Sequence, residues 1–245
     1  MSWTRMLFTL LVLSVTASNL FAQSNIISSV IANGDFQSGN TGFSTNYQYR
    51  DPLTTTPVTV FDPGTYTIAP NMTTPVLLHP SALNFYDHTF GNASGSFMII
   101  NGSIHLGDAI WSTTVDVELN RDYSFSLWAA YWNNSLNHLP ELIFSFNDTI
   151  VYGGEIDGDI ATWKNISANW NSGSNSSVTI KILNTNTDYA GNDFALDDIS
   201  FGLTIAAVPE PATLVLAGSV LAGAGGYVIL KRLRYKITHK SCRSK

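Results

Sequence analysis

An alternation of side chains along residues 123–132 constrains the fold of this chain more than any other feature. One set of alternate positions holds Tyr123, Phe125, Leu127, Ala129 and Tyr131, and the other holds Ser124, Ser126, Trp128, Ala130 and Trp132. A period of two is typical of a β-strand with one buried face, and no helix produces it over such a length. Runs of similar character occur at residues 97–100, 111–119, 142–146, 178–183 and 194–201.

The segments between these runs are rich in Asn, Ser and Gly, as at residues 92–95 and 171–174. These residue types tolerate turn geometry. No window of the body has the 3.6-residue periodicity of an amphipathic helix. About ten short strands joined by turns predict an all-β domain, an antiparallel β-sandwich of the jelly-roll type.

The first 22 residues are typical of a secretory signal peptide. Arg5 supplies a positive start, Met6–Val15 is uncharged, and Ala22 can supply the small residue before cleavage. The uncharged stretch is short for a membrane span, although an uncleaved anchor is the alternative. We expect a signal peptide at 1–22, one β-sandwich domain at 23–205 and a sorting tail at 206–245.

Charge is distributed very unevenly along the chain. Residues 23–208 hold four Lys and Arg against 17 acidic residues, a formal charge of −13, whereas seven Lys and Arg follow Leu230. So acidic a domain repels phosphate backbones, which argues against nucleic-acid binding, and it attracts divalent cations. The only cysteine, Cys242, lies in the tail, so the domain contains no intramolecular disulfide.

The tail has three consecutive parts. Val208, Pro209, Glu210 and Pro211 come first, and the two prolines favour an extended, accessible segment. Residues 211–230 carry no charge and are long enough to cross a membrane as one helix. A basic cluster follows, which places that end in the cytoplasm and the β-domain outside. Its members are Lys231, Arg232, Arg234 and Lys236.

This order of motif, span and basic cluster resembles the PEP-CTERM sorting signal of Gram-negative bacteria that make exopolysaccharide. The resemblance implies recognition by a membrane-embedded exosortase, transient anchoring in the inner membrane, and delivery to the cell surface or extracellular matrix. A plain type I membrane anchor preceded by a chance Pro-Glu-Pro is the alternative.

The two ends of the body carry a second resemblance. Residues 33–37 (Asn-Gly-Asp-Phe-Gln) open it, and residues 192–199 close it with an adjacent aspartate pair. This pairing is similar to the galactose-binding-like jelly rolls that include many carbohydrate-binding modules. It implies that the terminal strands meet and that oxygen ligands from both hold a structural Ca²⁺, with solvated turn carboxylates as the alternative. The candidate ligands are Asn33, Asp35, Gln37, Asp197 and Asp198.

Trp128 and Trp132 are the best sequence evidence for a ligand. Because successive side chains of a strand alternate between its faces, both indoles belong to one face. Flat indole faces stack on sugar rings, so the pair predicts a glycan-binding surface. The alternative is that two packed sheets bury both tryptophans.

Catalytic motifs are missing from the sequence. It contains no G-x-S-x-G and no H-E-x-x-H, and Glu155, Asp157 and Asp159 lack EF-hand spacing and suit a solvated loop. We expect no enzyme, but a structural or binding role in an exopolysaccharide or biofilm matrix, with extracellular polysaccharide as partner. A dedicated glycan-binding module and a cryptic polysaccharide hydrolase are the alternatives.

Overall fold

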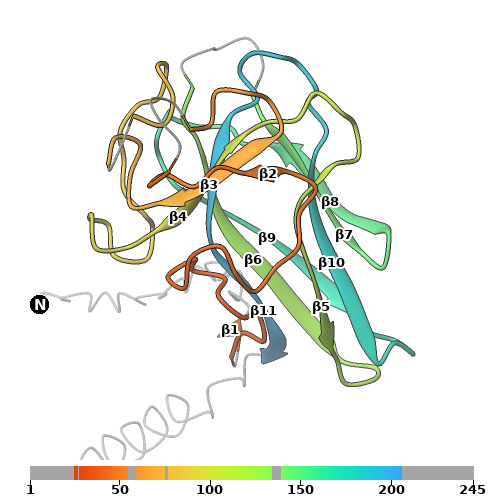
Figure 1. Ribbon diagram of the computed structural model, residues 1–245. Helices are drawn as coiled ribbons and strands as arrows, with labels where there is room; N and C mark the ends of the chain where they lie inside the picture. Colours follow the sequence, from red (N-terminus) through yellow and green to blue (C-terminus); the bar gives the residue numbers. More distant parts are fainter. Residues whose placement is uncertain (1–24, 27, 55–58, 75–76, 134–138, 206–245) are drawn as a thin grey trace, which may run out of the picture.

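The structure is a computed structural model that describes residues 25–26, 28–54, 59–74, 77–133 and 139–205 (Figure 1). Within these residues the chain forms eleven β-strands and no α-helix, which confirms the all-β class. The strands are β1 (Asn25–Ile26), β2 (Gln48–Tyr49), β3 (Thr65–Ala69), β4 (Phe97–Asn101), β5 (Ala109–Asp116), β6 (Asp122–Tyr131), β7 (Glu141–Phe146), β8 (Thr149–Glu155), β9 (Lys164–Asn171), β10 (Ser177–Asn184) and β11 (Phe194–Ile205).

The strands form two sheets. The large sheet has the order β2-β3-β4-β11-β6-β9, with β1 paired to β11, and the small sheet has the order β5-β10-β7-β8, along the right side of Figure 1. Every pairing is antiparallel except the short contact between β2 and β3. This arrangement is consistent with the predicted jelly-roll sandwich.

The main core fills the space between the two sheets. Tyr123, Phe125 and Leu127 of β6 are buried there, as the alternation in the sequence predicts. The ring centroids of Phe125 and Phe144, one from each sheet, lie 5.0 Å apart in an edge-to-face contact. The alternate residues Ile180 and Ile182 of β10 are buried in the same core. Because each sheet buries one face in this layer, the two outward faces are left for other contacts.

A second core lies on the outward face of the large sheet. Val60, Met72 and Leu78, from the long connections around β3, are fully buried against this face. The strand residues beneath them include Ile99 and Ala195. Part of a sheet face that would otherwise meet solvent is therefore covered.

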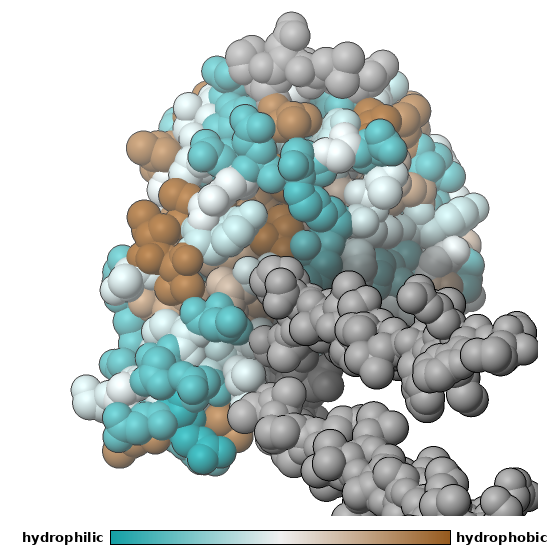
Figure 2. Space-filling view, turned by 180° about the vertical axis from the view of Figure 1, so that it is seen from behind, coloured by the Kyte–Doolittle hydropathy of each residue, from teal (hydrophilic) through white to brown (hydrophobic). Residues whose placement is uncertain are grey.

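The surface carries no single continuous apolar area on the side shown in Figure 2, where hydrophilic side chains separate smaller apolar patches. The predicted signal peptide and membrane span lie outside the described residues. Among the residues that are described, no helix is long and apolar enough to cross a membrane.

Candidate functional site

The two ends of the domain meet, as the resemblance implies. The Ile199 N–H donates to the Gly34 carbonyl at 2.9 Å, and the Val30 N–H donates to the Phe201 carbonyl at 2.8 Å. Gly34 also packs so closely on the Ile199 carbonyl that the position has no room for a Cβ. This junction brings the segment of the candidate calcium ligands at residues 33–37 next to the segment that contains Asp197 and Asp198.

Three of the five candidate ligands line one shallow pocket of about 330 Å³ at the junction. They are Asn33, Asp35 and Asp198, and Ser29 and Ser200 line the same pocket. All five residues bear oxygen, the donor that hard cations such as Ca²⁺ prefer. The pocket is therefore the place in the described structure where the predicted cation would be expected.

The side chains of the two amide candidates are already hydrogen-bonded, that of Asn33 within its own loop and that of Gln37 partly to a distant segment. The Asn33 Nδ2 donates to the carbonyls of Gly39 and Thr41, each at 2.8 Å, and its Oδ1 accepts the N–H of Ser38 at 2.8 Å. The Gln37 Nε2 donates to the carbonyls of Asp35 at 2.8 Å and Ser96 at 3.1 Å. Gln37 thus turns its amino group, rather than an oxygen, toward two carbonyl oxygens from separate segments.

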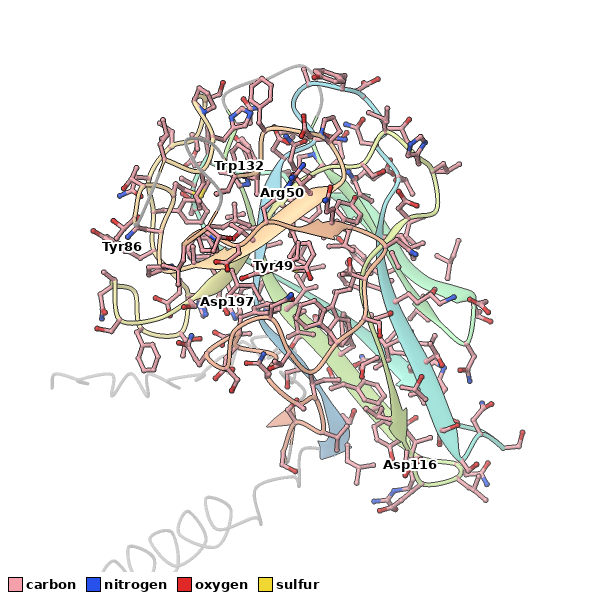
Figure 3. The ribbon with its side chains drawn as sticks, in the orientation of Figure 1. Tyr49, Arg50, Tyr86, Asp116, Trp132 and Asp197 are labelled. Atoms are coloured by element: carbon pink, nitrogen blue, oxygen red, sulfur yellow. The ribbon has the colours of Figure 1, made fainter. Side chains whose placement is uncertain are left out.

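Asp197 is buried away from this pocket. Its Oδ2 accepts the N–H groups of His88 at 2.7 Å and Thr89 at 3.3 Å, and its Oδ1 accepts the N–H of Asp198 at 2.9 Å. Burial is the main cause that raises the pKa of Asp197 to about 8, and the negative charge of Asp198 is the second. Figure 3 shows Asp197 near the middle of the molecule.

A β-bulge explains how both neighbouring aspartates reach the same segment. The register of β11 against β6 shifts between Asp197 and Ser200, and Asp198 has a φ of 47°. In a regular strand the two carboxylates would point to opposite faces. Here Asp198 also contacts this segment, through His88 Nδ1 at 2.6 Å and the Thr89 hydroxyl at 2.7 Å.

The five candidates therefore do not form one coordination sphere. Among the residues described, no group of three or more His, Cys, Asp or Glu side chains is arranged to hold a metal ion. A cation in the junction pocket would use the carboxylates of Asp35 and Asp198 together with amide, hydroxyl and carbonyl oxygens. Calcium binding stays a prediction.

The expectation of an exposed Trp128–Trp132 pair is wrong for Trp132, which is fully buried. Its Nε1 donates to the Phe194 carbonyl at 2.8 Å, and its ring lies 5.1 Å from that of His79. Both tryptophans do share the outward side of the large sheet, Trp128 within β6 and Trp132 directly after it, but residues around β3 cover Trp132. Trp128 lies outside this covered area and is partly exposed.

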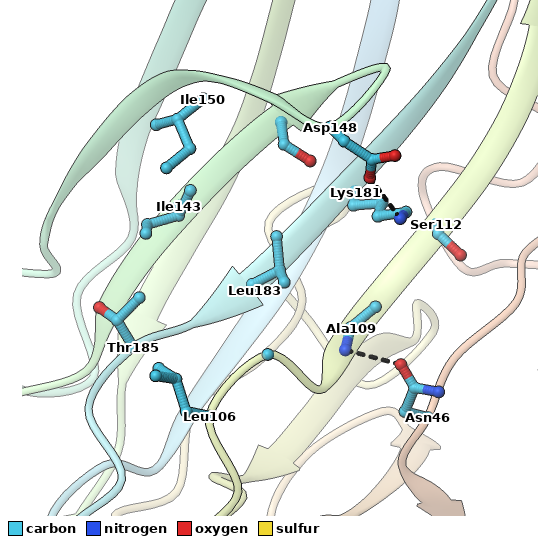
Figure 4. Close-up of a pocket in the computed structure, with 12 residues that line it drawn as sticks. Asn46, Leu106, Ala109, Ser112, Ile143, Asp148, Ile150, Lys181, Leu183 and Thr185 are labelled. Carbon is cyan, nitrogen blue, oxygen red and sulfur yellow. Dashed lines mark hydrogen bonds and ion pairs between the residues drawn. The ribbon is translucent and has the colours of Figure 1, made fainter.

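A groove on the outward face of the small sheet was not predicted from the sequence. Its volume is about 360 Å³, and Figure 4 shows its lining. Ala109, Ile143 and Leu183 contribute apolar surface from three strands. The exposed side chains of Leu106 and Ile150 add apolar surface, with 74% and 64% of their area accessible.

Neutral polar groups and one ion pair complete the groove. Asn46 is fixed because its Oδ1 accepts the Ala109 N–H at 2.8 Å, and Ser112 and Thr185 also line the groove. The Lys181 Nζ lies 2.7 Å from the Asp148 Oδ1 (Figure 4). An open groove with apolar surface and a few polar groups is typical of a site for small molecules or sugar chains.

The alternation along residues 178–183 was enough to predict that the side chains of Lys181 and Leu183 lie on the outward face of their strand. The groove itself could not be predicted, since its residues come from five separate parts of the chain: Asn46, the Leu106–Ser112 region, β7, the start of β8 with its turn, and β10 with Thr185.

One further pocket bears on the hydrolase alternative. Glu141 and Glu155 face each other across β7 and β8 and line a polar pocket of about 330 Å³. Both side chains are exposed, whereas the reacting groups of a hydrolase usually lie in a site that excludes water. Asp157, the middle residue of the acidic loop expected from the sequence, pairs with Lys164. Neither the exposed Glu141–Glu155 pair nor the paired Asp157 favours the hydrolase alternative.

The sorting motif (Val208, Pro209, Glu210, Pro211) and the basic cluster (Lys231, Arg232, Arg234, Lys236) lie outside the described residues. A family model does match there: residues 207–232 match the PEP-CTERM protein-sorting motif. The predicted sorting signal is thereby confirmed. A search of curated proteins finds no match to the sequence.

Solved structures similar to the described domain include binding modules and enzymes. The CBM22-1 xylan-binding domain of Paenibacillus barcinonensis Xyn10C is 13% identical, with a TM-score of 0.42, over 75% of this chain and 97% of that one. A family 35 carbohydrate-binding module from an environmental isolate is 14% identical, with a TM-score of 0.34, over 45% and 79% of the two chains. A Stig cyclase from Fischerella sp. TAU is 13% identical, with a TM-score of 0.43, over 74% and 100%. At these TM-scores the likenesses decide nothing about function.

Proposed function

We propose that this chain, which carries the PEP-CTERM protein-sorting motif at residues 207–232, is exported and sorted by an exosortase to the cell surface or extracellular matrix. In this proposal the apolar stretch at 211–230 anchors it transiently in the inner membrane, with the basic cluster on the cytoplasmic side. The β-sandwich is then the part that works outside the cell.

The sandwich, in this proposal, binds glycan chains through the groove on the small sheet. The groove is the observation that carries it, because apolar surface from Ile143, Leu183 and Ile150 lies beside neutral polar groups. Sugar rings have the same two-sided chemistry, with apolar C–H faces and a rim of hydroxyls. An open groove also lets a long polymer pass through, which an enclosed cavity does not.

A non-catalytic role follows from this assignment. The protein would hold or organise exopolysaccharide in the matrix, and the exposed Glu141–Glu155 pair would not cleave it. Loss of polymer length during prolonged incubation with the protein would instead support the hydrolase alternative. Size-exclusion chromatography of the polymer measures this directly.

The binding test uses mature protein recovered from the host surface and the host's own exopolysaccharide. Leu106→Ser and Ile150→Ser remove exposed apolar surface from the groove with little effect on folding. Each change should weaken retention in affinity electrophoresis about five- to tenfold, since it removes on the order of 1 kcal/mol of contact. Leu53→Ser, at an equally exposed leucine that does not line the groove, is the control. Unchanged retention of a double variant that carries both Leu106→Ser and Ile150→Ser would contradict glycan binding in this groove.

A further inference from the structure

We infer that the groove takes uncharged glycans and excludes polymers that bear carboxylate, sulfate or phosphate groups. This inference rests on the proposed function and names its ligand class. It follows from how the domain uses its few cationic side chains.

Every Lys and Arg of the β-domain lies in an ion pair with a neighbouring acid. Arg50 Nη2 lies 3.0 Å from Asp62 Oδ2, and Arg121 Nε lies 3.4 Å from Glu118 Oε2. Lys164 pairs with Asp157.

Lys181, the fourth cation, pairs with Asp148 at 2.7 Å. Anionic sugars are held by free guanidinium or ammonium groups that donate to their oxygens. Residues 23–208 contain no other Lys or Arg that could do so.

The groove itself is neutral. Lys181 and Asp148 are the only ionisable residues of its described lining, and they compensate each other. An exposed ion pair is worth only about 0.2–1 kcal/mol, so an anionic ligand could separate it. The ligand charge would then lie beside Asp148, whose side chain is 81% exposed, and the exchange would bring no net gain.

The electrostatic field of the whole domain also disfavours anionic polymers. With 17 acidic and four cationic side chains, the domain repels a polyanion before contact, most strongly at low ionic strength. A neutral polymer experiences no such barrier. Its hydroxyls can bond with Asn46, Ser112 and Thr185, while its ring faces lie on the aliphatic surface.

The experiment compares the binding of matched polymers to mature protein recovered from the host surface. Exopolysaccharide is separated by anion exchange into neutral and acidic fractions, and part of the neutral fraction is carboxymethylated. Chelator is present throughout, so that divalent cations cannot bridge two anions. We expect the neutral fraction to bind, and the carboxymethylated form to bind at least tenfold more weakly at low salt, with the gap narrowing as salt increases.

The variants Asp148→Lys and Asp116→Lys test whether the groove itself discriminates against charged polymers. Both variants change the net charge of the domain by the same amount, but only Asp148 lines the groove. Asp116 is exposed on the same sheet but does not line the groove. Asp148→Lys should raise binding of the carboxymethylated polymer several-fold more than Asp116→Lys. An equal gain in the two variants would contradict discrimination by the groove.

The remaining outcomes separate this inference from the proposed function. If acidic or carboxymethylated polymer binds the unaltered protein as tightly as the neutral fraction, the inference fails while glycan binding stands. Binding of no fraction at all overturns the proposed function and the inference together.

Discussion

The imidazole of His88 lies stacked on the indole of Trp128, with ring centroids 3.8 Å apart and 17° between the ring planes. His88 is held there by Asp198 through its Nδ1 and by Asp197 through its backbone N–H. One face of the indole is therefore covered by a residue that is fixed to β11. Trp128 belongs to the contact that holds the 88–89 segment on the large sheet, and it is not a free platform for sugars.

The two tryptophans are expected to respond differently to truncation. Trp132→Ala empties a fully buried site and should lower the free energy of unfolding by about 3–5 kcal/mol. Trp128→Ala removes a partly exposed stacking contact worth about 0.5–1.5 kcal/mol. Urea denaturation followed by far-UV circular dichroism measures both changes. Equal losses for the two variants would contradict the difference in burial.

Asp193 is expected to make stability decrease as pH rises. It is buried, its Oδ1 has no hydrogen-bond partner among the described residues, and burial raises its pKa to about 6. Between about pH 4 and pH 6 the folded state therefore holds a proton that the unfolded state, with a pKa of about 3.9, has released.

The stabilising contribution of protonated Asp193 is complete below about pH 4 and is lost as pH rises through about 6. In Asp193→Asn the amide oxygen can still accept from Asn133, and the titration is absent. The difference in unfolding free energy between the two proteins should change by up to about 3 kcal/mol between pH 4 and pH 7. A difference that does not vary with pH would refute this assignment.

Calcium is expected to stabilise the domain through the junction pocket. Asp35→Asn should reduce the effect, because Asp35 is one of the two carboxylates that line this pocket. Saturation at 100 times Kd would add about 2.7 kcal/mol, which thermal melts with calcium and with chelator detect. Identical melts for the natural sequence in both conditions would rule the site out.

Processing is expected to depend on the Pro-Glu-Pro segment. Replacement of Pro209, Glu210 and Pro211 by alanine should leave an unprocessed form in the inner membrane, because a helix could then continue toward the β-domain. Intact-mass measurement of surface fractions should find the natural protein without residues 1–22 and without the chain beyond about residue 211. Recovery of mature surface protein that still ends at Lys245 would contradict exosortase processing.

The sequence by itself determined the β class, the buried face of the strands and the sorting tail. Each depends on local information: a period of two in Tyr123, Phe125 and Leu127, and the order of motif, apolar stretch and basic cluster after Val208. Local periodicity records which side chains share a face of a strand. It therefore placed Trp128 and Trp132 on one face correctly.

Only the tertiary structure decided which part of a face is covered. Residues around β3 bury Trp132 but not Trp128, and these covering residues lie about 35 to 70 positions earlier in the chain. A bulge at Asp198 redirected the aspartate pair, and the groove joined Asn46 to residues of four later segments. Such contacts join segments that are distant in sequence, and hydrophobic burial, which drives them, has no direction along the chain. Periodicity could therefore specify the faces of this sandwich, but not what each face contacts.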